Sequence, residues 1–374
     1  MFMILKQKIF LIHIIRHGRL FMCEFVVNLK EILKTFDKAK SNLKKGVKVC
    51  TILKANAYGF GARKICSLLK LKSDYFAVAR LSEFLKIKDL TTKPILILSP
   101  LTLNEIKIAV EQGGEISVGS VENLKFVNSV AQNKHKIAKI HIALDTGMNR
   151  FGFKSLSDLE KMLEMAEEMK YVQIVGAYSH IYDAENQKST AKQREMFLEF
   201  KKQIEKHGLK PIFHFANSEG LKNIENQFDM VRLGFDLYYS VDNLHKFQAN
   251  ILEIKNVKKG ENISYSHAYI APCDMKIAIC SAGYADGVPR CLSSKGKVLV
   301  CGKESKIVGR VCMDVLMCDI SKIKVAKVGD EVVIFGKQKQ SSISVCQVAE
   351  NCDTIAYEIY TSISDRVKRV YKWR

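Results

Sequence analysis

A lysine at the end of a strand-like segment is the first residue that could do chemistry. Lys54 directly follows the mainly apolar run Val47–Leu53, and no other charged residue occurs before Arg63. In a parallel barrel the carboxyl ends of the strands form the mouth where active sites lie. A lysine that loses water there has a lowered pKa and can form a Schiff base with a carbonyl compound. The alternative interpretation is an ordinary surface lysine at a strand end.

Two other kinds of site are not supported by the spacing of the residues. Gly59 and Gly61 begin a dinucleotide-binding pattern, but Lys64 stands where the third glycine is required. His13 and His17 are four residues apart, but the glutamate of an HExxH zinc motif does not follow His13. We therefore predict neither a dinucleotide site nor a metal site.

The chain is basic along its whole length rather than in one patch. Its 59 lysines and arginines exceed its 39 acidic residues, which gives a formal net charge of +20. Lysine is often interleaved with glutamate, as in residues 159–170, and the sequence has no arginine-rich tract and no zinc-finger spacing. This distribution favours a solvated surface that attracts anionic substrates over a nucleic-acid partner.

The cysteines indicate a reducing compartment. There are 11 of them, spread from Cys23 to Cys352 without a CxxC pair and often inside apolar runs. An odd number in such positions fits reduced, mostly buried thiols of a cytoplasmic protein better than a disulfide framework.

The elements that must position Lys54 alternate along the chain between strands and amphipathic helices. Helical patterns include Ser157–Met169 and Ala191–Lys206. Such alternation predicts parallel βαβ units, and eight of them favour a TIM-type (β/α)8 barrel, with an open doubly wound sheet as the alternative. The eight predicted strands are Val47–Leu53, Tyr75–Ala79, Pro94–Leu98, Glu115–Val118, Lys139–Leu144, Val172–Tyr178, Ile212–Phe215 and Met230–Leu233.

A second, mostly-β domain is predicted after the barrel, because helical periodicity fades and strand-like runs separated by glycine-containing turns take over. We assign residues 23–242 to the barrel and 243–374 to the C-terminal β domain, and treat residues 1–22 as an extension that is non-native or disordered. The apolar part of that extension is too short for a membrane span, and we expect the natural start at Met22. The five predicted strands of the second domain are Met275–Ser281, Lys297–Cys301, Ser305–Val311, Val315–Ile320 and Glu331–Phe335.

Motifs along nearly the whole chain, from about residue 24, resemble those of alanine racemases. The stretch 54–61 resembles the lysine signature of that family, and eight further segments match in the right order. They are residues 145–152, 178–180, 216–218, 231–234, 264–266, 283–287, 309–314 and 355–358. Each match is weak alone, but eight in order across both domains are specific.

The resemblance implies a cofactor and a pair of acid/base groups. It implies that pyridoxal phosphate is held as a Schiff base by Lys54. It also implies that Tyr265 of a neighbouring subunit is the second base, on the opposite face of the substrate. Since tyrosine ordinarily has a pKa of about 10, nearby cations must tune it, and the resemblance places His180 and Arg232 beside the cofactor. The family pattern therefore implies a homodimer with shared active sites.

Further positions take their roles from the same resemblance. Arg232 would face the pyridine nitrogen and disfavour its protonation, which suppresses transamination. The phosphate would be held by Tyr58, Ser218 and Gly234, near the end of the eighth strand. Without the resemblance, Ser218 would be read as a helix N-cap.

The substrate side of the site is implied in the same way. Arg150 resembles the arginine that contacts the cofactor oxygen and the substrate carboxylate, and Met313 resembles a residue near that carboxylate. Tyr284 and Tyr357 resemble the tyrosines that narrow the mouth of the site, and Tyr357 is counted among the cofactor contacts. A narrow mouth favours a methyl side chain over larger ones.

Two positions depart from the family pattern. Ala143 stands where several members carry a carbamate-modified lysine that orients the arginine at the position of Arg150. Arg150 must therefore be oriented in another way, for example by a bound anion. Asn149 is the second departure, which we interpret as tolerable variation.

The predicted function is the interconversion of L- and D-alanine, which supplies D-alanine for peptidoglycan. A racemase for serine or for several amino acids is the nearest alternative. A decarboxylase is disfavoured because Arg232 stands where such enzymes place an acidic residue. A non-catalytic carrier of pyridoxal phosphate would lack the second domain with Tyr265.

Overall fold

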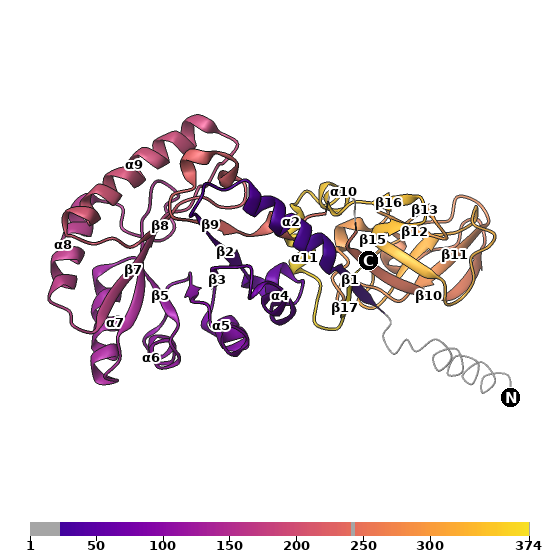
Figure 1. Cartoon of the computed structure of the whole chain (residues 1–374). Helices are drawn as coiled ribbons and strands as arrows, with labels where there is room; N and C mark the ends of the chain where they lie inside the picture. The colour runs from indigo at the N-terminus through magenta and orange to yellow at the C-terminus, as the bar shows by residue number, and fades with distance from the viewer. Residues whose placement is uncertain (1–22, 241–243, 374) are drawn as a thin grey trace. The chain divides into compact units, whose positions relative to one another are not determined.

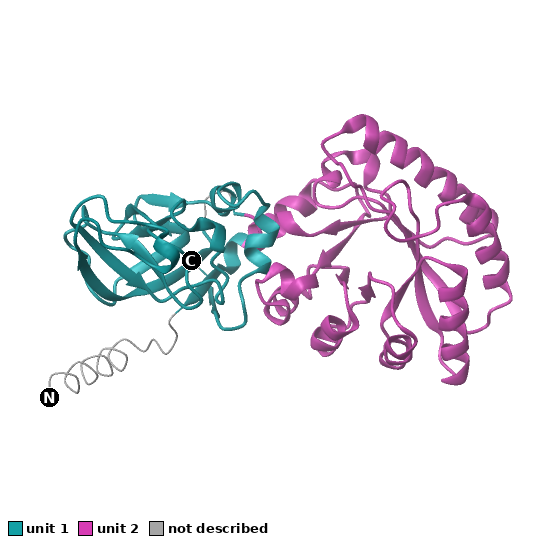
Figure 2. Cartoon of the chain, turned by 180° about the vertical axis from the view of Figure 1, so that it is seen from behind, with its two compact units in different colours: residues 1–31, 240–374 teal, residues 32–239 magenta. Residues whose placement is uncertain are grey.

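The computed structural model describes residues 23–240 and 244–373, and the chain divides into two compact units (Figure 2). Unit 2 is the continuous segment Ile32–Tyr239, and unit 1 combines the residues before it with those from Ser240 onward. The predictions made for residues 1–22 lie outside the described part of the chain.

Unit 2 is a parallel barrel of eight strands. In the order β9-β2-β3-β4-β5-β6-β7-β8, each strand is paired in parallel with the next. Backbone hydrogen bonds from Asp229 N to Phe213 O and from Arg232 N to Ala216 O, both 3.0 Å long, connect β9 to the segment containing β8. The strands are β2 (Lys48–Ile52), β3 (Tyr75–Val78), β4 (Ile95–Ile97), β5 (Glu115–Val118), β6 (Ala138–Ala143), β7 (Val172–Tyr178), β8 (Ile212–His214) and β9 (Met230–Leu233).

Helices lie outside these strands (Figure 1). Their apolar faces pack inward, and several begin at a side-chain cap, such as Thr102, Ser120 and Ser155, that accepts a bond from the backbone N–H of the first turn. The helices are α2 (Leu29–Ser41), α4 (Ala62–Leu69), α5 (Leu81–Ile87), α6 (Leu103–Gln112), α7 (Val121–Asn133), α8 (Leu156–Glu167) and α9 (Gln187–Lys206).

The predicted fold class is confirmed. All eight predicted barrel strands are present, with ends that differ by at most one residue, and the backbone hydrogen bonds between the segments of β8 and β9 bring the sheet close to full closure. Near-continuous apolar runs are typical of strands buried on both faces, which is why these segments could be located from the sequence.

Unit 1 is built around a nine-stranded sheet. The long strand β10 pairs with β1, β11 and β15, and β1 also pairs in parallel with the last strand β17. Two short helices, α10 (Val345–Glu350) and α11 (Ala356–Thr361), precede β17. The strands are β1 (Glu24–Asn28), β10 (Lys246–Val257), β11 (Met275–Cys280), β12 (Lys297–Val300), β13 (Lys303–Lys306), β14 (Leu316–Asp319), β15 (Glu331–Gln338), β16 (Ser341–Ile343) and β17 (Lys368–Lys372).

The predicted domain boundary at residue 23 differs from the division in the structure. Strand β1 hydrogen-bonds to β10 and β17, so the chain begins its described part in unit 1 and enters the barrel only after Glu31. The boundary predicted between residues 242 and 243 lies close to the observed one, which falls between Tyr239 and Ser240.

The expectation that all cysteines are reduced was wrong for one pair. Cys291 and Cys352 form a disulfide with their Cα atoms 5.4 Å apart, although 61 residues separate them in the sequence. The other nine cysteines form no disulfide, and five of them are buried. Among the described residues no helix is long and apolar enough to cross a membrane.

Candidate active site

Lys54 begins an unusual backbone turn at the end of β2. Helix α3 (Lys54–Tyr58) has left-handed conformation at four consecutive non-glycine residues, Ala55 to Tyr58, with φ between 51° and 54°. Left-handed residues other than glycine cost about 1–2 kcal/mol each, so the surrounding structure must hold this turn in place. Asn56 contributes, because its side-chain oxygen accepts the N–H of Ala62 at 2.8 Å.

Glu83, at the start of α5, holds the same turn from the neighbouring strand loop. Its carboxylate accepts the N–H of Ala55 at 2.6 Å, and also those of Ala79 and Arg80 at 2.8 and 3.1 Å. The loops after β2 and β3 are therefore joined through one side chain. Glu83 was missed in the sequence, where the local signal is only a glutamate in the first turn of a helix.

The amine of Lys54 is partly buried among cations. Burial lowers its pKa, and the charges of Arg150 and Arg232 lower it further, whereas Glu83 opposes this shift. A lysine with a lowered pKa has a larger neutral fraction, and the neutral amine is the form that attacks carbonyl carbons.

Arg232, on β9, is buried and held by acceptors on every terminal nitrogen. Nη1 donates to the ring and carbonyl of His214 at 2.9 Å each, and Nη2 donates to the carbonyls of Ser179 and Phe215 at 2.6 and 3.1 Å. Within the described chain no hydrogen bond uses Nε. One N–H of a fixed guanidinium is thus available to another group.

His180, just after β7, stays neutral beside Arg232. Burial lowers its pKa to about 3, and Arg232, Arg150 and Lys54 lower it in the same direction. Its Nδ1 lies 3.4 Å from Arg232 Nη2, so Nδ1 accepts and the proton is carried on Nε2. His180 can therefore donate a hydrogen bond from Nε2 without carrying a charge.

Tyr58, Ser218 and Gly234 come together at the ends of β2, β8 and β9. Ser218 Oγ accepts the N–H of Gly234 at 2.7 Å. A Cβ on Gly234 would lie 2.9 Å from the Tyr58 hydroxyl and 3.6 Å from Ser218 Oγ, so only glycine leaves this small polar space open. The structure thus places the three residues predicted to hold a phosphate side by side.

Arg150 lies on an exposed loop after β6 whose shape is set by Asp145. The Asp145 carboxylate accepts the N–H groups of Gly147 and Asn149 at 2.9 and 3.0 Å. Asn149 has φ of 56°, a left-handed conformation that asparagine adopts more readily than most residues, so asparagine is compatible with this position.

Ala143 is buried and offers no group to orient Arg150. The backbone of Gly152 passes directly against it, where a Cβ would lie 2.7 Å from the Ala143 carbonyl. Among the described residues Arg150 has no ion pair, and its guanidinium lies 5.6 Å from the ring centre of Phe151.

Tyr265, predicted as the second base, lies on unit 1 and is 65% exposed. The turn that carries it is firmly held. Ser264 Oγ donates to the Arg310 carbonyl at 2.8 Å, and both Ser264 and Ser266 have left-handed backbone with φ of 71° and 58°. A large aromatic side chain on a fixed, exposed turn is suited to contact another surface.

Tyr284 and Met313 are neighbours on unit 1. The N–H of Tyr284 donates to Cys312 O and that of Ala285 donates to Met313 O, both at 3.0 Å. A Cβ on Gly283 would lie 2.2 Å from Met313 O, so the two turns approach this closely only because residue 283 is glycine.

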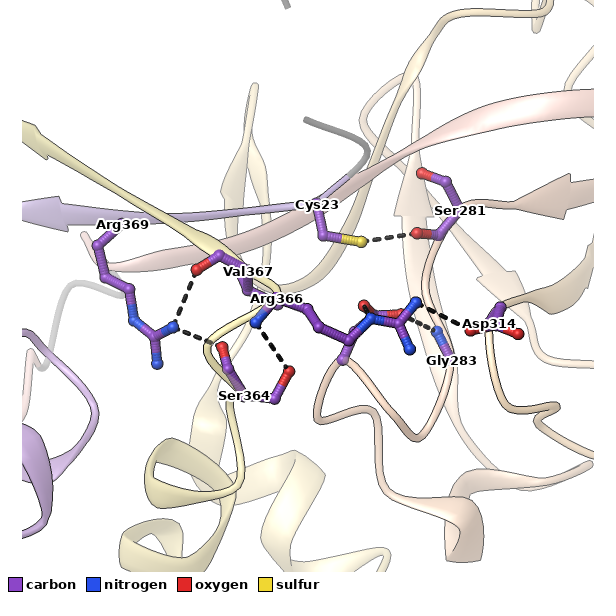
Figure 3. Close-up of polar contacts among 9 residues, drawn as sticks. Cys23, Ser281, Gly283, Asp314, Ser364, Arg366, Val367 and Arg369 are labelled. Carbon is purple, nitrogen blue, oxygen red and sulfur yellow. Dashed lines mark hydrogen bonds and ion pairs between the residues drawn. The ribbon is translucent and has the colours of Figure 1, made fainter. Parts of the chain in front are cut away.

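Arg366 links these two turns (Figure 3). It contacts Asp314 at 2.8 Å and Asp286 at 3.4 Å, and Asp286 accepts the N–H of Gly283 at 3.0 Å. Tyr357, the remaining predicted site residue, lies at the start of α11 and is partly exposed.

The structure thus gathers six of the predicted residues at the carboxyl ends of the barrel strands, with Arg150 on the loop among them. These six are Lys54, Tyr58, His180, Ser218, Arg232 and Gly234. Tyr265, Tyr284, Met313 and Tyr357 belong to unit 1. Among the described residues no cluster of three or more potential metal ligands occurs.

Comparisons with known proteins agree with both units. Residues 27–241 match the family described as alanine racemase, N-terminal domain, and residues 244–371 match alanine racemase, C-terminal domain. Alanine racemase 2 of Caldanaerobacter subterraneus subsp. tengcongensis is 36% identical over 366 residues, which cover 93% of this chain and 94% of that protein.

Solved structures give the same result. An alanine racemase of Clostridium difficile 630 has a TM-score of 0.89 and 31% identity, covering 94% of this chain and 96% of that one. The alanine racemase of Bartonella henselae with covalently bound pyridoxal phosphate has a TM-score of 0.84 and 26% identity, covering 94% of this chain and 99% of that one.

These observations define an amino-acid racemase, which is an isomerase. The barrel carries a lysine of lowered pKa at a strand end, a mostly-β unit follows it, and racemases match both units. The chain belongs to the alanine racemase family. That family depends on pyridoxal phosphate, and one structural neighbour holds it covalently.

Proposed function

We propose that this racemase interconverts L- and D-alanine with pyridoxal phosphate as its cofactor and with Lys54 and the partner subunit's Tyr265 as its two bases. The observation that carries the proposal is the lysine of lowered pKa beside Arg232, with the cradle of Tyr58, Ser218 and Gly234 on the same strand ends. The matches to alanine racemases over both units support the same assignment.

The donors present fit pyridoxal phosphate. Lys54 would hold it covalently through Nζ, Arg232 would face its ring nitrogen with the Nε–H that no described residue uses, and the cradle would receive the phosphate. Without a Cβ, Gly234 leaves room for a group of that kind. When bound, the cofactor withdraws electrons from the substrate Cα and so makes its proton acidic.

The two bases then move protons on opposite faces. Lys54 Nζ takes or returns the Cα proton on one face, and its lowered pKa keeps it able to accept a proton. The hydroxyl of Tyr265 does the same on the other face. His180, neutral and beside Arg232, would donate a hydrogen bond from Nε2 to a group in the site.

Arg232 favours racemisation over transamination. It is a permanent cation that donates a hydrogen bond, so protonation of a ring nitrogen beside it is disfavoured by like-charge repulsion. A weaker electron sink favours return of the proton to Cα over its transfer elsewhere, which is what a racemase requires.

We infer that the active enzyme is a homodimer with shared sites. The exposed, fixed turn that carries Tyr265 supports this, because a second chain could receive the tyrosine at its own Lys54 site. Met313, Tyr284 and Tyr357 would contact substrate or narrow the mouth of the site, and Arg150 would bind the carboxylate.

A racemase for serine or for several amino acids is the second candidate. The width of the mouth of the site decides whether only alanine or also larger substrates can enter. We also propose that the enzyme works in the cytoplasm, as expected from its cysteines, nine of which form no disulfide. The family resemblance supports the proposal that it supplies D-alanine to the cell wall. Neither point affects the chemistry at Lys54.

A panel of L-amino acids incubated with the enzyme in deuterated water tests the proposal. We expect deuterium at Cα and formation of the D-enantiomer, fastest with alanine. Equal or faster conversion of serine would favour the broad racemase, and absence of exchange with every amino acid would contradict racemisation.

A further inference from the structure

We propose that Glu115, His141 and His214 are positioning residues that act as one buried hydrogen-bonded chain, orienting the guanidinium of Arg232 and supplying its counter-charge. The catalytic consequence rests on the proposed function, whereas the existence of this hydrogen-bonded chain does not. The four residues lie on β5, β6, β8 and β9, and all are buried inside the barrel.

Three contacts of the same length connect them. Glu115 Oε2 lies 2.9 Å from His141 Nε2, and His141 Nδ1 lies 2.9 Å from His214 Nε2. His214 Nδ1 lies 2.9 Å from Arg232 Nη1. The chain therefore runs without a gap from a carboxylate to the arginine of the site.

The direction of every proton in the chain follows from one fact, that a guanidinium only donates. His214 Nδ1 must accept from Arg232, so the proton of this neutral ring is on Nε2. That proton is donated to His141 Nδ1, which must also be unprotonated. His141 then carries its proton on Nε2 and donates it to Glu115. Burial lowers the pKa of His214 well below its ordinary value, consistent with a neutral ring.

The barrel wall is locally shaped to let the two histidines meet. Strand β7 lies between β6 and β8, and Gly176 on β7 is paired with His141. A Cβ on Gly176 would lie only 2.0 Å from His141 Nδ1. The pairing of β6 with β7 also shifts register between Ile140 and His141, which is a local irregularity at the same place.

Tyr178 packs against two members of the hydrogen-bonded chain, His214 and Arg232. Its ring is stacked on His214 with centroids 5.0 Å apart, and the guanidinium carbon of Arg232 lies 5.4 Å from the same ring. The Tyr178 hydroxyl is itself 2.7 Å from Ser117 Oγ. His214 and Arg232 are therefore held by packing as well as by hydrogen bonds.

The buried positive charge of Arg232 requires a compensating negative charge. Among the described residues no carboxylate contacts this guanidinium, and its charged neighbours include the cation Arg150. Burial lowers the pKa of Arg232 to about 10. A carboxylate at the far end of a polarised chain stabilises the cation without occupying Nε, the donor that the cofactor would use.

The proton pattern can be tested directly in the holoenzyme by nitrogen NMR with ¹⁵N-labelled histidine. We expect His141 and His214 both to be neutral at pH 7, with a protonated Nε2 and a bare Nδ1. A proton on Nδ1 of either ring, or an imidazolium at either position, would contradict the proposed hydrogen-bonded chain. This readout does not depend on catalytic turnover.

Two variants test the functional consequence. Glu115→Gln removes the charge, and His214→Asn keeps an acceptor for Arg232 but breaks the connection to His141. For each we expect kcat to fall about 10-fold with KM changed less than about 2-fold, because orientation rather than binding is lost. We also expect a rise of about 10-fold in the keto acid formed per racemisation event, as the alanine amino group is left on the cofactor.

The control is His207→Gln, a histidine on the outside of the barrel that bonds to Glu160 and Glu167 and not to Arg232. It should leave the keto-acid ratio unchanged. A wild-type ratio in both Glu115→Gln and His214→Asn would overturn the positioning role. If the unmodified enzyme racemises nothing, the proposed function fails and the NMR pattern alone decides whether the chain exists.

Discussion

Single residues at the strand ends determine which groups can carry a proton. Lys54 and His180 both have lowered pKa values because they are buried beside Arg232 and Arg150, so both are neutral near pH 7 more readily than free side chains. Neutral bases beside a fixed cation are suited to proton transfer, and the same cations attract an anionic substrate and cofactor.

Glu83 provides a prediction at this scale, because it holds the left-handed turn that begins at Lys54. Glu83→Ala removes the acceptor of three backbone N–H groups, of which that of Ala55 is nearest to Lys54. We expect a loss of about 1–3 kcal/mol in the free energy of unfolding, measured by chemical denaturation, and faster loss of cofactor absorbance on dialysis.

Glu105→Ala is the matched control, since Glu105 also accepts bonds at the start of a helix but only from Thr102. It should lower stability and leave cofactor retention unchanged. Equal cofactor retention by the two variants would show that Glu83 acts only as a helix cap.

At the scale of elements, local apolar patterning was enough to locate the barrel but not all of unit 1. Strands β5, β7 and β9 have the predicted ends, because buried parallel strands are continuous apolar runs. Strand β10 was missed although it is 12 residues long, since Lys246, Asn250 and Lys255 interrupt its apolar pattern. The pairing of β1 with β17 joins opposite ends of the chain, which no local pattern can indicate.

The residues of the candidate site also divide into those that the sequence could indicate and those that it could not. Lys54 stood out because it follows a strand, and the remaining positions came from family resemblance. Glu115 and His141 were missed, since each is an isolated polar residue in a predicted strand and belongs to no recognisable motif. Their significance depends on neighbouring strands placing them at the same level. Polar residues within otherwise apolar barrel strands are the signal that could have found them.

The disulfide gives a prediction about the elements of unit 1. It joins the segment after Tyr284 to the segment before Tyr357, which are 61 residues apart at the cysteines. Cys291→Ser should lower the free energy of unfolding by about 2–4 kcal/mol through greater entropy of the unfolded chain. The measurement is denaturant unfolding with and without a reducing agent.

Cys273→Ser is the control, because Cys273 is exposed and unpaired. Reductant should destabilise the unmodified protein and the control equally and leave Cys291→Ser unaffected. If reductant does not change the stability of the unmodified protein, the disulfide contributes nothing to it.

At the scale of the whole molecule, the two units hold different halves of the proposed machinery. Unit 2 carries Lys54 with the cofactor cradle, and unit 1 carries Tyr265 on an exposed turn. In a two-fold symmetric dimer each unit 1 can serve the barrel of its partner. The account therefore predicts that function depends on two chains and not on one.

Mixing two inactive variants tests this central claim most directly. Lys54→Ala and Tyr265→Phe should each lose nearly all alanine racemisation alone. After equal amounts are unfolded and refolded together, half of the dimers are mixed and each mixed dimer has one intact site, so activity should return to about a quarter of the wild-type value. If both bases of a site come from one chain, every site keeps a lesion, and the mixture would stay inactive.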